Sequence, residues 1–266
     1  MSTVRIDLEA PMSWQALSSG QVRAVARITH GGLLREEQLI ALFCELCGVT
    51  LSREGEVIML HRGEEATPID VLALGDLSSR FGWVLDTEPD DTACPFGSIN
   101  RYLLDTTFGD YFHADAMLLR FATTGDMECA RRAYKDLDCM EERQKRWRES
   151  LKDGLVNKEE YESKLKKLRK KYDSMDEVDA WAMQLWWCGV KNGLKVRYPL
   201  VFESPDDRGC EGYDPIAARQ NIMLMLADGK PQDNEKIEQS NLHDVLSALQ
   251  HKIEQAKHAE EQLKKR

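Results

Sequence analysis

The chain has 266 residues, of which 42% are hydrophobic and 31% charged, and its formal net charge is −10. This composition is typical of a folded globular protein with one large or two modest domains, and it excludes a disordered or fibrous chain. The acidic balance argues against nucleic-acid binding by the whole surface, and no apolar run approaches the roughly 18–20 residues of a membrane span.

The start of the chain and its cysteines indicate a reducing compartment. Arg5, Asp7 and Glu9 are unlike a secretory signal, and seven cysteines form an odd set. Cys44 and Cys47 lie three apart inside an apolar run that is typical of a helix, without the further ligands that zinc needs. We therefore expect a cytoplasmic protein with buried, reduced thiols, and neither a metal nor a cofactor.

Residues 12–50 predict two helices. Ser13 or Ser18 is suited to cap the first, and the second spans about 35–47 and stops at Gly48.

A small β-hairpin is predicted near 56–69. Pro68 there suits only an edge position. A short helix follows over 70–81, and residues 86–99 have the composition of a loop.

From residue 106 the pattern is helical. Thr106 or Thr107 is suited to cap a helix that Gly125 ends, and Asp126 begins a longer helix to about residue 152.

Residues 137–172 predict an antiparallel helical hairpin, in which Asn157 and Glu160 form a capping box after a turn at Gly154. Two narrow apolar stripes repeat at spacings of three and four, which suits pairing with another helix. Their members are Leu137, Met140, Trp147 and Leu151 in the first helix, and Tyr161, Leu165, Leu168 and Tyr172 in the second.

The hairpin region is basic. Residues 131–171 carry 15 Lys and Arg against nine Asp and Glu, so the rest of the chain has a net charge of −16. A solvated face with internal ion pairs accounts for this pattern. The alternatives are an acidic partner protein and, less favoured, nucleic acid.

Residues 175–202 contain the densest apolar stretch, which predicts a buried central helix followed by extended chain over 198–202. Gly189 and Gly193, four residues apart on that helix, allow a close approach of another helix.

A tail follows, with a linker over 205–212 and a helix from Pro215. The last helix has about 25 residues, with Leu246, Leu249 and Ile253 at coiled-coil core positions.

Catalytic motifs are absent from the sequence. Asp110 and His113 lie one helical turn apart, but no nucleophile is implied beside them, and a structural hydrogen bond is the simpler interpretation. We therefore expect a protein that is not an enzyme.

Several segments together resemble a tail-morphogenesis family, with tail-assembly-chaperone-like members, from phages and prophages of Bacteroidetes-type mobile elements. The resemblance covers most of residues 11–203 and is carried by Pro11–Leu17, Val22–Arg27, Thr106–Tyr111, Thr124–Asp126, Leu185–Lys191 and Tyr198–Phe202. Separately, residues 152–168 are similar to a short helical-hairpin oligomerisation module. The family resemblance implies a phage tail-assembly factor that binds tape-measure or tail-tube proteins, or a structural component of the element.

The expected fold is mostly α, with a multi-helix domain over 1–204, one small β-hairpin, a protruding charged helical hairpin, and a C-terminal helical tail over 205–266. The expected partners are proteins, including further copies of the chain, with nucleic acid a minor alternative and no membrane. The residues expected to bind a protein partner are Trp147, Leu151, Tyr161, Leu165, Leu168, Leu246, Leu249 and Ile253.

Overall fold

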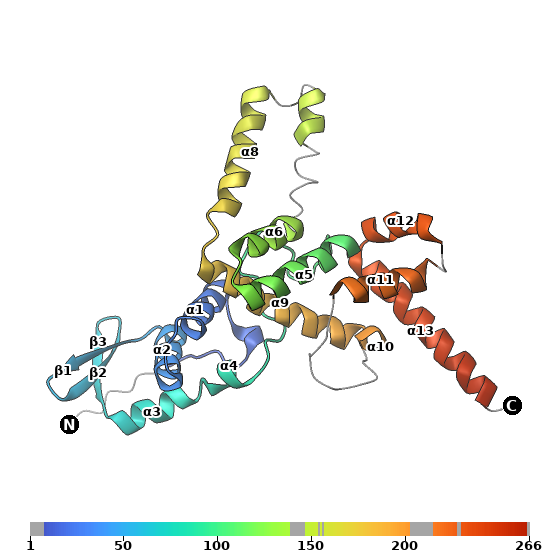
Figure 1. The fold of residues 1–266 in the computed structure, drawn as a ribbon. Helices are drawn as coiled ribbons and strands as arrows, with labels where there is room; N and C mark the ends of the chain where they lie inside the picture. Colours follow the sequence, from blue (N-terminus) through green and yellow to red (C-terminus); the bar gives the residue numbers. More distant parts are fainter. Residues whose placement is uncertain are drawn as a thin grey trace. The chain divides into compact units, whose positions relative to one another are not determined.

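The computed structural model is mostly helical with a small antiparallel sheet (Figure 1), which confirms the predicted fold class. The described residues are 8–138, 147–153, 155, 157–202, 215–227 and 230–264. The predictions of a linker over 205–212, of Met140 in the first stripe and of a turn at Gly154 fall outside these residues. Among the described helices, none is both long and apolar enough to cross a membrane.

The chain divides into two compact units. The first contains Met1–Phe96 and Trp181–Asn192, and the second contains Gly97–Ala180 and Gly193–Arg266. This division differs from the boundary expected near residue 204, because the C-terminal segment belongs to the same unit as residues 97–180.

The first unit begins with two helices whose ends follow from local chemistry. The Ser18 side chain accepts a hydrogen bond from the Gln21 amide in a capping box, and Gly48 ends the second helix with φ of 65°. The elements of this unit are η1 (Trp14–Ala16), α1 (Ser19–Thr29), α2 (Arg35–Cys47), β1 (Thr50–Glu54), β2 (Val57–Arg62), β3 (Glu65–Ile69), α3 (Val71–Ser79), α4 (Gly82–Asp86) and residues 181–192 of α9 (Glu177–Arg197).

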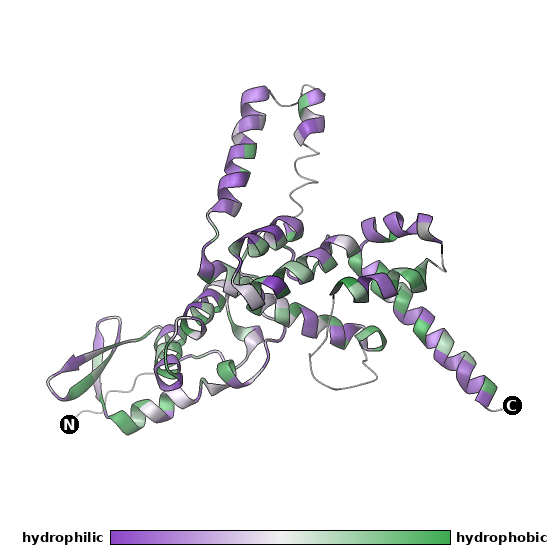
Figure 2. Ribbon diagram, in the orientation of Figure 1, coloured by the Kyte–Doolittle hydropathy of each residue, from purple (hydrophilic) through white to green (hydrophobic). Residues whose placement is uncertain are grey.

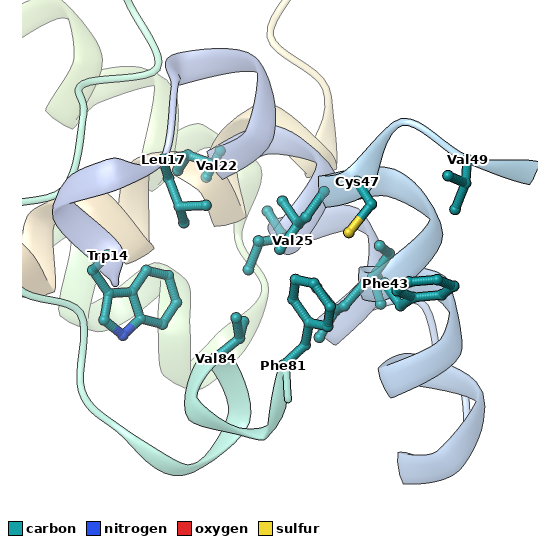
Figure 3. Packing of buried hydrophobic residues seen from close by; sticks show 14 of the residues in the cluster. Trp14, Leu17, Val22, Val25, Phe43, Cys47, Val49, Phe81 and Val84 are labelled. Carbon is teal, nitrogen blue, oxygen red and sulfur yellow. The ribbon is translucent and has the colours of Figure 1, made fainter. Parts of the chain in front are cut away.

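Aromatic and aliphatic side chains from these elements share one core. Figure 3 shows Val25 of α1, Phe43 of α2 and Phe81 just before α4 converging on its interior. Trp14 is buried edge-on to Trp83, with ring centroids 5.6 Å apart. The core therefore joins elements that are distant in sequence.

The sheet has three strands where the sequence predicted two. Strand β2 pairs with both β1 and β3, and the tight turns at Gly55 and Gly63 have positive φ values of 64° and 59°. The expectation that Pro68 occupies an edge strand is confirmed. The extra strand β1 was missed because it is almost entirely polar and exposed.

Helix α9 supplies buried aromatic residues, as the sequence predicts for a central helix. Trp186 and Trp187 are buried, and Trp181 stacks on His30 with ring centroids 3.7 Å apart. A Cβ built at Gly189 meets the Thr92 Oγ1 at 2.9 Å and the Thr92 amide nitrogen at 3.2 Å, whereas a Cβ at Gly193 meets nothing within 4 Å. A close approach therefore exists at Gly189 but not at Gly193, and it is made by the loop that carries Thr92 rather than by a helix as expected.

Over its described residues the second unit is built from helices and their connections, with an isolated β-bridge between Thr107 and Asn241. The side chains of Thr107, Asp126 and Asn157 each accept a hydrogen bond from a backbone amide in the first turn, which confirms these residues as helix starts. The elements of this unit are α5 (Phe108–Thr124), α6 (Met127–Leu137), a helical stretch over 147–152, α8 (Lys158–Asp173), α10 (Pro199–Phe202), α11 (Pro215–Leu226), η2 (Pro231–Asp233), α12 (Asn234–Gln239) and α13 (Leu242–Lys264), together with both ends of α9.

The prediction of extended chain over 198–202 is wrong. These residues form the short helix α10, with Pro199 at its first position. Proline has no backbone N–H to lose there, and its φ already suits a helix. The apolar residues that follow Pro199 are compatible with a helical turn as well as with a strand.

Substituting the two glycines of α9 tests the packing at Thr92. Gly189→Ala is expected to lower the free energy of unfolding by about 1–2 kcal/mol, because overpacking outweighs the gain in helix propensity. Gly193→Ala is the matched control on the same helix and should be neutral or stabilising by up to ~1 kcal/mol. Urea denaturation measures both, and equal stability of the two variants would contradict the close contact.

Candidate protein-binding site

A buried carboxylate anchors helix α8 to helix α6. Asp138, the C-cap residue of α6, is 1% exposed. Its Oδ2 accepts hydrogen bonds from the Lys171 Nζ at 2.7 Å and from the Tyr172 hydroxyl at 2.6 Å. A negative charge is unfavourable at a helix C-terminus and costly to bury, so the two donors from α8 are what make this position tolerable.

Aromatic packing completes this anchor. Tyr134 of α6 and Tyr172 of α8 are buried edge-on, with ring centroids 5.0 Å apart, and the Lys171 Nζ lies 5.1 Å from the Tyr134 centroid. The same Nζ donates to the Ser98 hydroxyl at 2.6 Å. The end of α8 that carries Lys171 is therefore held by charge, hydrogen bonds and packing together.

The helical stretch over 147–152 and the whole of α8 together form what we call the arm, residues 147–173. Figure 1 shows the helical stretch over 147–152 and α8 running in opposite directions. Figure 2 shows that hydrophilic residues dominate α8.

The arm residues predicted to bind a partner divide according to their distance from the anchor. Leu168, one turn from Tyr172, is buried. The other four keep part of their side-chain surface exposed, and we call them the arm stripe: Trp147, Leu151, Tyr161 and Leu165. The four residues of the arm stripe are therefore only partly buried, whereas Leu168, closer to the anchor, is buried.

Apart from Lys171, the basic residues of α8 fall into two groups, those that form an ion pair within the helix and those that do not. Lys158 pairs with Glu162 at 3.9 Å and Lys164 pairs with Glu160 at 2.8 Å, as the solvated-face interpretation predicts. Four further residues are exposed and form no ion pair with any described residue: Lys166, Lys167, Arg169 and Lys170. Internal pairing thus accounts for only part of the positive charge.

The residues expected to bind a partner through α13 require a correction. Leu246 and Leu249 are buried within the second unit, at 0% and 2% exposure, while Ile253 is partly buried. Helices α5, α10 and α11 contact α13, so the chain covers this part of the stripe itself. Leu246 and Leu249 are therefore core residues.

Backbone hydrogen bonds fix the start of α13 against the start of α5. The Phe108 amide donates to the Ser240 carbonyl at 2.9 Å, and the Leu242 amide donates to the Thr106 carbonyl at 3.0 Å. Beside them, His243 Nδ1 lies 2.9 Å from the Tyr198 hydroxyl, and burial raises the pKa of that tyrosine. The C-terminal segment is thus an integral part of the second unit.

A pocket of 540 Å³ lies among α5, α11 and α12 in this unit. Its charged groups already have partners within the chain. Arg219 pairs with Glu238, and His113 Nδ1 lies 2.6 Å from Asp136 Oδ2. Asp110, which the sequence placed near His113, accepts from the Thr107 hydroxyl at 2.7 Å. The charged side chains that line or border the pocket are therefore held by contacts within the chain.

Cys44 and Cys47 lie in α2 as free thiols. Burial raises the pKa of both thiols, which keeps them protonated and weakly nucleophilic. Across the part of the chain that the structure describes, no group of three or more His, Cys, Asp or Glu side chains is arranged to hold a metal ion.

The residues that organise the arm were not predicted from the sequence. Ser98 and Asp138 lie 73 and 33 positions from Lys171, and neither belongs to a motif. The one available signal was the basic excess of 131–171, which marks a region but singles out no residue.

Comparisons of the chain with protein-family models, curated proteins and solved structures found no match.

Removing the charge of Asp138 tests the anchor. Asp138→Asn is expected to lower the free energy of unfolding by about 1–3 kcal/mol, because Lys171 and Tyr172 lose a charged acceptor. Hydrogen exchange should also show faster exchange of the α8 amides. The control is Asp173→Asn, which removes the same charge from an exposed position of α8. If both variants match the parent protein, the anchor contributes nothing to stability.

Proposed function

We propose that this chain is a non-enzymatic assembly factor that binds an α-helix of a partner protein along its arm. The observation that supports this most directly is the combination of an anchored base at Asp138 with a partly exposed apolar stripe further along. A surface that is rigid at one end loses less conformational entropy on binding than a free helix does.

The chemistry of the arm stripe suits helix recognition. Trp147 and Tyr161 are residue types enriched among those that dominate binding energy at interfaces, and Leu151 and Leu165 add aliphatic contact. Spacings of four residues within each helix place these side chains on one face, so that an amphipathic partner helix can lie between them.

The biological setting rests on the family resemblance alone. By that resemblance, the partner is a tape-measure or tail-tube protein, and the chain acts in the cytoplasm of a bacterial host during phage tail assembly. The alternative is a structural component of the phage or mobile element. Purified particles distinguish the two, since an assembly chaperone is absent from them and a structural subunit is present.

A second candidate function, nucleic-acid-associated regulation, is favoured by one observation, the four exposed basic residues of α8 without an ion pair among the described residues. Binding of this kind weakens steeply as salt concentration rises. A gel-shift series with DNA and RNA at low salt tests it, and no shift removes this candidate.

A pair of aspartate substitutions on α8 tests helix capture. Leu165→Asp places a charge in the arm stripe and should reduce capture of the partner by a tagged chain by at least about tenfold, since desolvating an unpaired carboxylate is costly. Ser163→Asp introduces the same residue two positions away, at an exposed site, and should leave capture unchanged. The bait is the full chain, in cells carrying the whole source element, and the readout is quantitative mass spectrometry.

Circular dichroism should show both variants folded, because Leu165 is only partly buried. A partner set that is the same for Leu165→Asp, Ser163→Asp and the parent protein would rule out the arm stripe as the binding surface.

A further inference from the structure

The positions that border the arm stripe carry mostly positive charge. In a helix whose core positions are Tyr161, Leu165 and Leu168, the residue directly after Tyr161 or Leu168 and the residue directly before Leu165 flank the partner helix. On α8 these flanking positions hold Lys164 and Arg169, with Glu162 as the acidic exception. Glu162 already pairs with Lys158.

The first helix of the arm repeats this arrangement. Arg148 directly follows Trp147, so it borders the same stripe from the other helix. Arg148 and Arg169 are both exposed, and neither forms an ion pair with any residue that the structure describes. Two guanidinium groups therefore stand beside the apolar side chains, available to carboxylates on a bound helix.

We propose that the arm selects a partner helix whose own apolar stripe is bordered by acidic residues. This inference rests on the proposed function and adds the chemistry of the partner. Apolar contact with the arm stripe provides attraction, while Arg148 and Arg169 set which helices fit, since Lys164 already pairs with Glu160.

The same charges disfavour a second copy of the chain. Stripe-to-stripe pairing of two arms would bring the arginine-rich borders together, and like charges at such positions oppose association. A nucleic acid would bind Lys166, Lys167 and Lys170, which point away from the stripe, as readily as it binds the bordering basic residues. Binding of that kind would not use the apolar side chains of Leu151 and Leu165.

Synthetic helices test the proposal directly. The probes are two fluorescent peptides of about three heptads with identical Leu and Ile cores, one with Glu and the other with Lys at every flanking position. Titrated with the full chain and followed by fluorescence anisotropy, the Glu-flanked peptide should bind at least about tenfold more tightly than the Lys-flanked peptide. Equal affinity for the two peptides would overturn the proposal.

Two double variants with the same change in net charge locate the selectivity. Arg148→Glu with Arg169→Glu should weaken binding of the Glu-flanked peptide by about tenfold and strengthen binding of the Lys-flanked one. Lys167→Glu with Lys170→Glu, on the far side of α8, should change either affinity by no more than about twofold. Equal losses in both variants, with competition by a short DNA duplex, would indicate nucleic acid instead.

Leu165→Asp separates this inference from the proposed function. If it abolishes capture of the cellular partner while Arg148→Glu with Arg169→Glu does not, the stripe binds a helix and the charge selection is wrong. If neither peptide binds and Leu165→Asp leaves capture unchanged, the proposed function itself fails. Sedimentation equilibrium tests the remaining occupant, since self-association of the parent protein that is lost in the Leu165→Asp variant would mean that a second copy occupies the stripe.

Discussion

The accommodation of one buried carboxylate organises the second unit. Asp138 is buried at the C-terminus of α6, where both the helix dipole and the loss of water oppose its charge. Hydrogen bonds from Lys171 and Tyr172, together with the positive charge of Lys171, offset both of these costs, and both residues lie on α8. The direction in which α8 leaves α6 is thus tied to an electrostatic requirement that apolar packing alone would not impose.

Because of this requirement, the two ends of α8 differ in how deeply their apolar side chains are buried. Near the anchor, Leu168 and Tyr172 are buried and serve the fold. A few turns away, Tyr161 and Leu165 keep part of their surface exposed, and the residues around them are mostly charged. An isolated hairpin of this length would be marginal in water, because short helices depend on tertiary contacts. The anchor supplies those contacts without covering the stripe.

The sequence predicted features that depend on local chemistry. Helix starts at Ser18 and Asn157 and the helix end at Gly48 involve bonds within a few residues, so their signals are complete in the local sequence. Strand β1 gives no such signal, since its stability comes from pairing with β2 rather than from its own pattern.

The site was only partly predictable for a related reason. An apolar stripe at helical spacing does not say whether the chain itself or a partner covers it. The stripe at Leu246 and Leu249 is covered by α5, α10 and α11, whereas the one at Tyr161 and Leu165 stays partly open. The contact between Asp138 and Lys171 joins residues 33 positions apart with no shared motif, so only the folded chain reveals it.

The division of α9 between the two units has a consequence for synthesis on the ribosome. Residues 8–96 emerge early, but the first unit still needs Trp181–Asn192 from α9. The second unit needs the start of α13, whose backbone bonds to residues 106–108. Domains usually fold as units, in the order in which they emerge from the ribosome. Here each core stays unfinished until its last segment has been translated, which is residues 181–192 of α9 for the first unit and the start of α13 for the second.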